Sequence, residues 1–192
     1  IIDKSHFLGA VYGMEKMMGR DHSPVRKVFD YAEEHFLSHL PITYILTVTE
    51  TQKQVTTLRG LYFGEEREVF TRAVAASQRY NLDLLDKPLQ KVVVYLDPDE
   101  FRSTWLGNKA VYRTRMVIAN SGELVIMAPG VRSFGEDPEI DRLIRAYGYK
   151  DRTEILRFVE TDQELKANLS VAAHLIHGSS DGRFKITYAT EH

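Results

Sequence analysis

Basic and aromatic side chains are concentrated in one short stretch of the chain, from Ser103 to Arg115. Its cations, aromatic residues and amide are Lys109, Arg113, Arg115, Trp105, Tyr112 and Asn108. A guanidinium group pairs with a carboxylate through two parallel hydrogen bonds, and lysine supplies a compact charge, so this composition suits an anionic substrate. A solvated basic helix face with one buried aromatic residue explains the same pattern, and composition by itself favours that interpretation.

Two histidines, His174 and His177, lie at the end of a predicted helix. Residues three apart face the same side of a helix, so both imidazoles can serve one site as metal ligands or proton carriers. A metal site needs a third ligand, which the sequence does not place beside them, and histidines at a helix end also cap its last carbonyl groups. His35 and His39, four apart on an amphipathic helix, are interpreted as surface residues.

A turn rich in glycine and proline, residues 128–137, follows an apolar run and precedes a predicted helix. Backbone N–H groups in such a turn can bind an anion, and Arg132 lies within it. Glu136 and Asp137 at the helix start would repel that anion, and glycine and proline at strand ends usually serve the turn alone. We therefore interpret residues 128–137 as a turn that does not bind an anion.

The elements that must position these residues alternate between strands and helices. Short apolar runs at 91–96 and 123–128 are typical of buried strands covered on both faces, and residues 103–120 between them predict a helix. Further helices are predicted at 138–147, 152–160 and 163–176, and a last strand at 184–188. This order predicts an α/β fold with a mainly parallel sheet and helices on both faces. Ligands of such sheets bind at the carboxyl ends of the strands, where the basic stretch begins.

The first part of the chain predicts a different arrangement. A helix begins at Pro24 and stops before Pro41, and a second helix covers residues 65–80. Runs rich in β-branched and aromatic residues at 42–49 and 55–63 predict a β-hairpin between them. We expect a boundary between residues 81 and 88. Residues 1–84 are then the end of a preceding domain, with its helix and hairpin, and residues 85–192 form a C-terminal α/β domain.

Composition narrows the possible partners and compartment. The 25 basic and 27 acidic residues give a net charge of -2 and are spread along the chain, so we expect neither nucleic acid nor membrane as a partner. The absence of cysteine excludes disulfides and favours a reducing compartment, with the cytoplasm as the default. The chain begins without methionine and ends directly after a strand-like run, so we expect part of a longer protein.

Four ordered motifs resemble the nickel-dependent lactate racemase family, and within it a branch labelled sugar-acid epimerases. They are Ser103–Arg115, Gly122–Gly130, Phe134–Pro138 and Ala173–Ser180. The resemblance covers nearly the whole chain as the C-terminal part of a longer protein. It implies an enzyme that racemises or epimerises a 2-hydroxy acid, lactate or a larger sugar acid, with a nickel-pincer nucleotide as hydride acceptor. It also implies that the cofactor-tethering lysine and the catalytic histidines lie on a missing N-terminal domain, so that this part is inactive alone.

The resemblance assigns roles to particular residues. His6 falls where the family has a nickel-ligating histidine, and Lys109 falls near the lysine that contacts substrate. Trp105, Asn108, Arg113, Arg115, His174 and His177 are then expected to shape the substrate pocket. The family glutamine one turn before its lysine is replaced here by Leu106 and Gly107, so the substrate contacts are expected to differ. Two other functions stay open: a cofactor-free protein that binds a carboxylate or sugar acid, and an interaction domain without a ligand.

Overall fold

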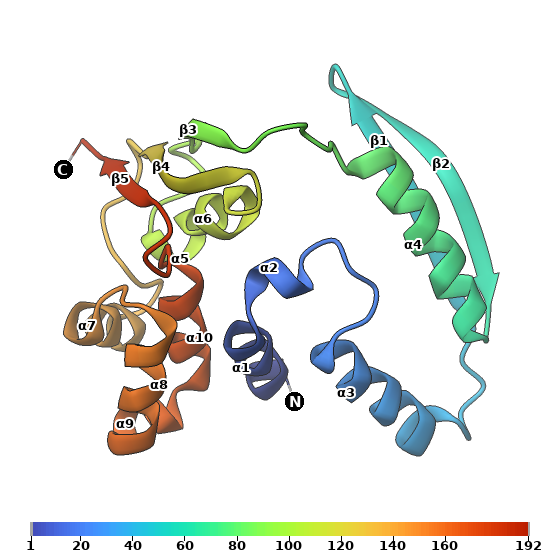
Figure 1. The fold of residues 1–192 in the computed structure, drawn as a ribbon. Coiled ribbons are helices and arrows are strands. Elements are labelled where there is room, and N and C mark those ends of the chain that lie inside the picture. The colour runs from blue at the N-terminus through green and yellow to red at the C-terminus, as the bar shows by residue number, and fades with distance from the viewer. Residues whose placement is uncertain (1, 192) are drawn as a thin grey trace. The chain divides into compact units, whose positions relative to one another are not determined.

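The computed structural model describes residues 2–191 and divides the chain into two compact units. One unit combines Ile1–Lys16 with Leu85–His192, and the other is Met17–Leu84 (Figure 1). The division after Leu84 lies within the expected boundary, but the first sixteen residues do not belong with the hairpin region as expected. Helix α1 (Ile2–Tyr12) instead packs with the C-terminal unit, because Ala10 and Phe7 join the apolar cluster around its last helix. The short helix α2 (Met14–Met17) follows.

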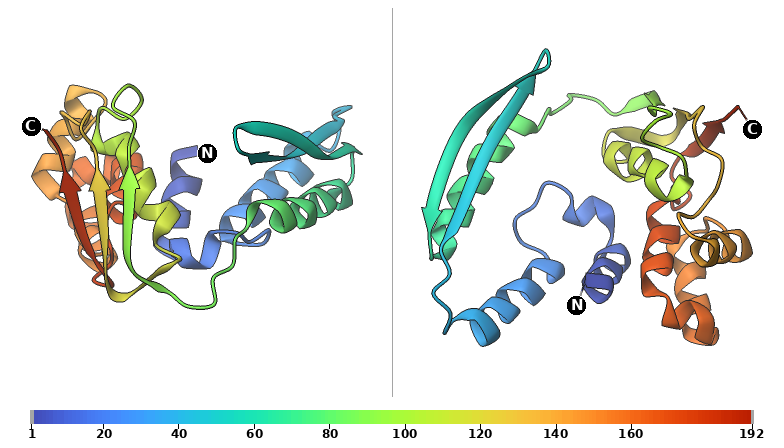
Figure 2. Two further views of the ribbon diagram at one scale, coloured as in Figure 1. Left: turned by 90° about the horizontal axis from the view of Figure 1, so that it is seen from above. Right: turned by 180° about the vertical axis from the view of Figure 1, so that it is seen from behind.

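A parallel sheet of three strands forms the centre of the first unit. The strands β3 (Leu89–Tyr95), β4 (Ile118–Met127) and β5 (Lys185–Ala189) lie in that order and run parallel. Figure 2 shows the three arrows side by side and pointing the same way. The predicted α/β class, with a parallel sheet flanked by helices, is confirmed.

Helices fill both connections of this sheet. Between β3 and β4 lie α5 (Thr104–Gly107) and α6 (Lys109–Thr114). Between β4 and β5 lie α7 (Pro138–Tyr147), α8 (Arg152–Thr161), α9 (Gln163–Ala167) and α10 (Leu169–His177). Four of these helices have an N-terminal cap, a side chain that accepts hydrogen bonds from the first backbone N–H groups of the helix. The caps are Ser103, Asp137, Asp151 and Asp162.

Two predicted helices have different bounds in the structure. The helix expected over residues 103–120 ends at Thr114, because the buried Ile118 already pairs with Leu89 as part of β4. The helix expected over 163–176 is interrupted at Asn168, whose side-chain Nδ2 donates to the Glu164 carbonyl oxygen. Such local side-chain bonds compete with the helical pattern, so α9 and α10 form separately.

The sheet residues alternate between a buried and an exposed face. Leu124 and Ile126 of β4 are fully buried and form one core cluster with Val111 of α6. On β3 the alternate residues Val93 and Tyr95 are 57% and 62% exposed. The expectation that this strand is covered on both faces is therefore wrong for the described residues, since β3 lies at the edge of the sheet. A second core cluster joins α10 to α7 and α8.

The second unit contains the hairpin. Strands β1 (Tyr44–Gln52) and β2 (Val55–Gly64) pair antiparallel, as predicted, and α4 (Arg67–Asn81) packs against both. Helix α3 (Pro24–Ala32) begins with Ser23 as its cap and continues as a π-helical turn, Glu33–Leu37. Large apolar side chains of the hairpin are exposed: Ile45, Val55, Leu58, Leu61 and Phe63. No helix within residues 2–191 has the length and apolar character needed to cross a membrane.

Candidate functional site

Two histidines from opposite ends of the chain meet where α1 packs on α10. The ring centroids of His6 and His177 are 4.8 Å apart, and the Tyr112 ring of α6 lies 6.2 Å from His177. His177 is only 6% exposed, and its Nε2 is buried without a hydrogen-bond partner among the described residues. Buried polar atoms are nearly always hydrogen-bonded, so an unpaired imidazole nitrogen indicates a place for a further group.

Lys109 lies one helical turn from Tyr112, on the same side of α6. It is half-buried, and within residues 2–191 its ammonium group makes no hydrogen bond and no ion pair. Arg113 is also on α6 and is exposed, and it too has no partner in this part of the chain. Both cations of this helix, which also carries Tyr112, are therefore available to an anion.

His174 belongs to a buried hydrogen-bond network on the adjacent side of α10. Its Nε2 lies 2.9 Å from the Tyr149 hydroxyl and 3.5 Å from Asn108 Nδ2, and Trp105 packs on its ring at 4.4 Å between centroids. Asn108 is 2% exposed and accepts a 2.5 Å hydrogen bond from the Tyr188 hydroxyl. Asn108 and His174, both expected as substrate contacts, are thus engaged with protein groups and support the position of Trp105.

The histidines of this region are kept neutral. Burial, together with the nearby His177 and His6, lowers the pKa of His174 to about 3. Burial, together with His6 and Arg115, likewise lowers the pKa of His177 to about 3. Burial also lowers the pKa of His6, against the opposing effect of Asp3. Neutral imidazoles present a lone pair, so they suit metal ligation or hydrogen bonding rather than charge pairing.

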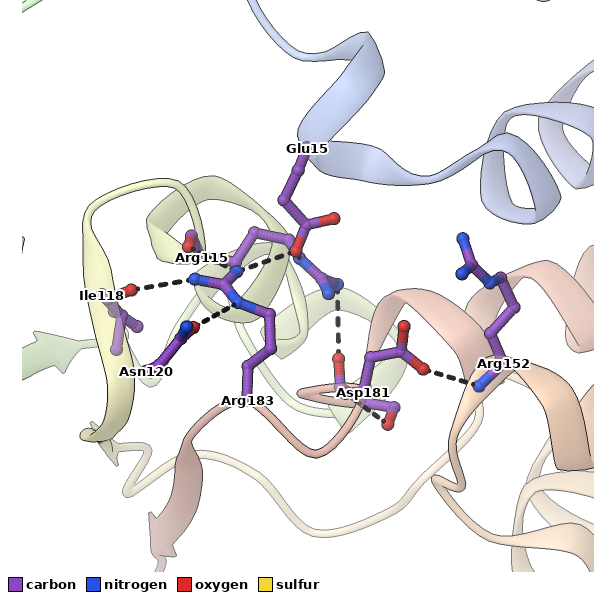
Figure 3. A network of polar contacts seen from close by, with 8 residues as sticks. Glu15, Arg115, Ile118, Asn120, Arg152, Asp181 and Arg183 are labelled. Atoms are coloured by element: carbon purple, nitrogen blue, oxygen red, sulfur yellow. Dashed lines mark hydrogen bonds and ion pairs between the residues drawn. The ribbon is translucent and has the colours of Figure 1, made fainter.

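Arg115 has a structural role, which corrects its expected contact with substrate. It is 3% exposed, its Nε donates to Glu15 Oε1 at 2.7 Å, and its Nη1 donates to the Ser179 carbonyl oxygen at 3.3 Å (Figure 3). Arg183 donates to the same Glu15 oxygen at 2.9 Å and to the Ile118 carbonyl oxygen at 3.0 Å. Through its ion pair with Glu15, Arg115 ties α2 to the α/β unit.

Glu15 is the acidic centre of this network. Burial by itself raises the pKa of Glu15, but hydrogen bonds from its own backbone amide and from Arg115 and Arg183 hold it below the usual value. A buried guanidinium is tolerated only with such a partner. This pairing could not be predicted from the sequence, because Glu15 and Arg115 lie far apart along the chain.

His35 and His39 are surface residues, as predicted. His35 is exposed on the π-helical turn, with its Nδ1 2.9 Å from the Tyr31 carbonyl oxygen, and His39 is exposed beyond it. No group of three or more histidine or acidic side chains within residues 2–191 is arranged to hold a metal ion. A metal at His6 would therefore need ligands from another source.

A pocket that the sequence interpretation did not predict lies between α7, α10 and the end of β5. Its volume is about 650 Å³, and its lining includes Thr104, Arg132, Phe134, Arg145, Tyr149 and Tyr188. The turn with Arg132 was interpreted as turn chemistry alone. Tyr149, Gly178 and Tyr188 come from separate elements, so only the fold brings them together.

The chain is similar to a protein from Thermotoga maritima whose crystal structure was determined by a structural genomics consortium. The identity is 25% and the TM-score is 0.78, and the match covers 99% of this chain and 49% of that one. This chain therefore spans about half the length of that protein, whose name states no activity. No protein-family model and no curated protein matches the chain.

Proposed function

We propose that this chain is the C-terminal part of an enzyme of the lactate racemase family that racemises or epimerises a 2-hydroxy acid. The observation that supports this most is that His6 of α1 and Tyr112 of α6, one helical turn from Lys109, both lie near His177. The buried Nε2 atom of His177 has no hydrogen-bond partner within residues 2–191. The two residues that the resemblance singles out, His6 and Lys109, are distant in sequence but belong to elements that meet at His177. A racemase needs such an arrangement, since one substrate must reach both the metal side and the cation.

The donor set at this place fits the proposed nickel-pincer nucleotide. His6 offers a neutral imidazole, a ligand type that nickel accepts. When bound, this cofactor supplies the acceptor for the hydride on the carbon that carries the hydroxyl group.

The residues of this chain would bind and orient the substrate. The ammonium Nζ of Lys109 has no partner within residues 2–191 and can pair with the substrate carboxylate. The Nε2 atom of His177, whose ring lies 6.2 Å from that of Tyr112, would provide a second hydrogen-bonding position. Fixing the carboxylate and a neighbouring hydroxyl restricts the rotation of the reacting carbon. The additional cation Arg113 favours a larger sugar acid over lactate.

The rest of the enzyme is proposed to be an N-terminal domain of the same protein. The Thermotoga maritima relative is about twice as long as the match. In addition, the hairpin exposes Ile45, Leu61 and Phe63 by 57% to 74%, a surface of the kind that another layer normally covers. The absence of cysteine favours a cytoplasmic location for the whole protein.

Titration calorimetry on the longer, nickel-loaded protein tests this proposal. Lys109→Ala should weaken the binding of a 2-hydroxy acid by about tenfold or more, because it removes a charge-assisted hydrogen bond. The matched control is Lys166→Ala, an exposed lysine of α9, which should leave the affinity unchanged. Unaltered affinity in Lys109→Ala would overturn the assigned site. Tighter binding of lactate than of aldonates would count against a sugar acid, and full binding without nickel would favour a cofactor-free binding protein.

A further inference from the structure

The pocket beside β5 has the position and size of a binding site. It lies where the loop after β4 and the end of β5 face α7 and α10, at the carboxyl ends of parallel strands. Ligands of α/β sheets usually bind at such ends. Its volume of about 650 Å³ is in the range of small-molecule sites. Neither His6, His177 nor Lys109 lines it, so it is not part of the proposed hydroxy-acid site.

The charged residues that line the pocket are all basic. Arg132 and Arg145 are its only charged residues among those described, and no carboxylate lines it. Arg132 is exposed and its guanidinium has no partner within residues 2–191. Arg145 pairs through Nε with Asp141 Oδ2 at 2.5 Å, and its guanidinium lies over the Phe134 ring at 4.6 Å. The charged part of the lining is therefore basic, and it includes one guanidinium group, that of Arg132, which is available to an anion.

The rest of the lining combines flat apolar walls with a few hydroxyl groups. The hydroxyls of Tyr149 and Tyr188 are bonded to Thr104 and Asn108, which fixes the positions of their rings. The hydroxyl of Ser180 has no partner among the described residues and remains available.

Gly178 makes this wall possible. A Cβ atom there would lie 2.2 Å from Asn108 Nδ2 and 2.6 Å from the Tyr149 ring. The absence of a side chain therefore lets Tyr149 and Asn108 approach α10 closely.

We infer that this pocket binds a small organic anion in which a carboxylate or phosphate is attached to a flat ring. The anionic group pairs with the guanidinium of Arg132. The ring packs against Phe134 and Tyr188. This site is independent of the proposed racemase activity, because it uses none of the residues assigned to that reaction.

The test is titration calorimetry of the 192-residue chain with phenyl phosphate, benzoate, inorganic phosphate and phenol. At least one of the two ring-bearing anions should bind with a Kd of about 1 mM or tighter. The neutral phenol should bind more weakly by about tenfold or more, since it lacks the charge-assisted hydrogen bonds. The stronger of phenyl phosphate and benzoate identifies the anionic group.

Two single-residue variants test whether the anion binds in this pocket. Arg132→Gln should weaken the preferred anion by about tenfold or more, since it removes the free guanidinium. Arg157→Gln, an exposed arginine of α8 outside the pocket, is the matched control and should bind as the original chain does. Absence of saturable binding by both ring-bearing anions, or equal affinity in Arg132→Gln, overturns the inference. Inorganic phosphate binding as tightly as phenyl phosphate overturns it as well, because the ring would then contribute nothing.

Discussion

The imidazole rings of His6 and His177 lie 4.8 Å apart, one at the start of the chain and the other at the end of its last helix. This contact requires α1 to pack on α10, which the apolar cluster with Ala10 provides. It places the proposed metal ligand beside His177, whose buried Nε2 has no hydrogen-bond partner within residues 2–191. The proposed activity depends on this arrangement.

Nickel retention should depend on His6. In the longer protein, loaded with its cofactor, His6→Ala removes the imidazole ligand and should reduce bound nickel by about tenfold or more, as loss of a metal ligand commonly does. Elemental analysis after gel filtration measures this. His22→Ala, whose side chain is 83% exposed, is the control and should retain the metal. Equal nickel content in His6→Ala would remove His6 from the site.

The free energy of unfolding of this chain should decrease as the pH is lowered, because two buried histidines are neutral in the folded state. The pKa values of His174 and His177 are about 3 in the folded protein, against 6.5 for a free histidine. The unfolded chain therefore binds more protons below pH 6.5, and the stabilising contribution, complete above that pH, is lost as pH falls toward 3. From about pH 7 to about pH 5 the free energy of unfolding should decrease by roughly 2–4 kcal/mol.

Urea unfolding at several pH values measures this dependence. His177→Asn should reduce the slope to about half, because one of the two buried titrating groups is removed. His22→Gln should keep the original slope, since that side chain is exposed. A slope that does not change in His177→Asn would contradict the neutral, buried state of this histidine.

The ion pair between Glu15 and Arg115 should contribute far more to stability than an exposed pair. Glu15→Ala leaves the 3% exposed Arg115 without its acidic partner and should cost about 3–5 kcal/mol of unfolding free energy. Glu164→Ala breaks the exposed pair with Arg142 and should cost at most about 1 kcal/mol. Chemical unfolding of both variants tests the difference. Similar costs for the two would show that the Arg115 pair is not buried in solution.

Gly178 should not accept a side chain. In Gly178→Ala the new Cβ meets Asn108 and Tyr149 at 2.6 Å or less, so the wall of the pocket must move, at a cost of about 1–3 kcal/mol or more. At Gly182 a Cβ meets nothing within 4 Å, and only its positive φ of 73° opposes alanine, at about 1 kcal/mol. Thermal unfolding compares the two. A smaller loss at Gly178 than at Gly182 would contradict the close packing.

The sequence predicted most of the elements but few of their contacts. Periodic apolar residues and capping side chains fixed α7 within its observed bounds, and β-branched runs predicted the hairpin. The end of α6 was missed because residues after Thr114 have helical composition, while Ile118 is drawn into β4 by its pairing with Leu89. Local propensity contains no information about such tertiary pairing.

The candidate site could be predicted only in part, because its tertiary contacts also cannot be inferred from local sequence. Lys109 and the histidines stood out by residue type, but the burial of Arg115 depends on Glu15, and the roles of Asn108 and His174 depend on Tyr188 and Tyr149. These partners come from separate elements, so no spacing rule relates them. Burial and pairing then decide which polar residues remain available to a ligand.

Stereochemical inversion is the most direct test of the central proposal. The longer protein, loaded with nickel cofactor, is incubated with one stereoisomer of a 2-hydroxy acid, an aldonate first and lactate second, and the products are separated by chiral chromatography. We predict that the C2 epimer or enantiomer accumulates to equilibrium, and that Lys109→Ala slows this by about a hundredfold, through loss of a charge-assisted contact to the carboxylate. No inversion of any 2-hydroxy acid by protein that contains nickel would contradict the proposal.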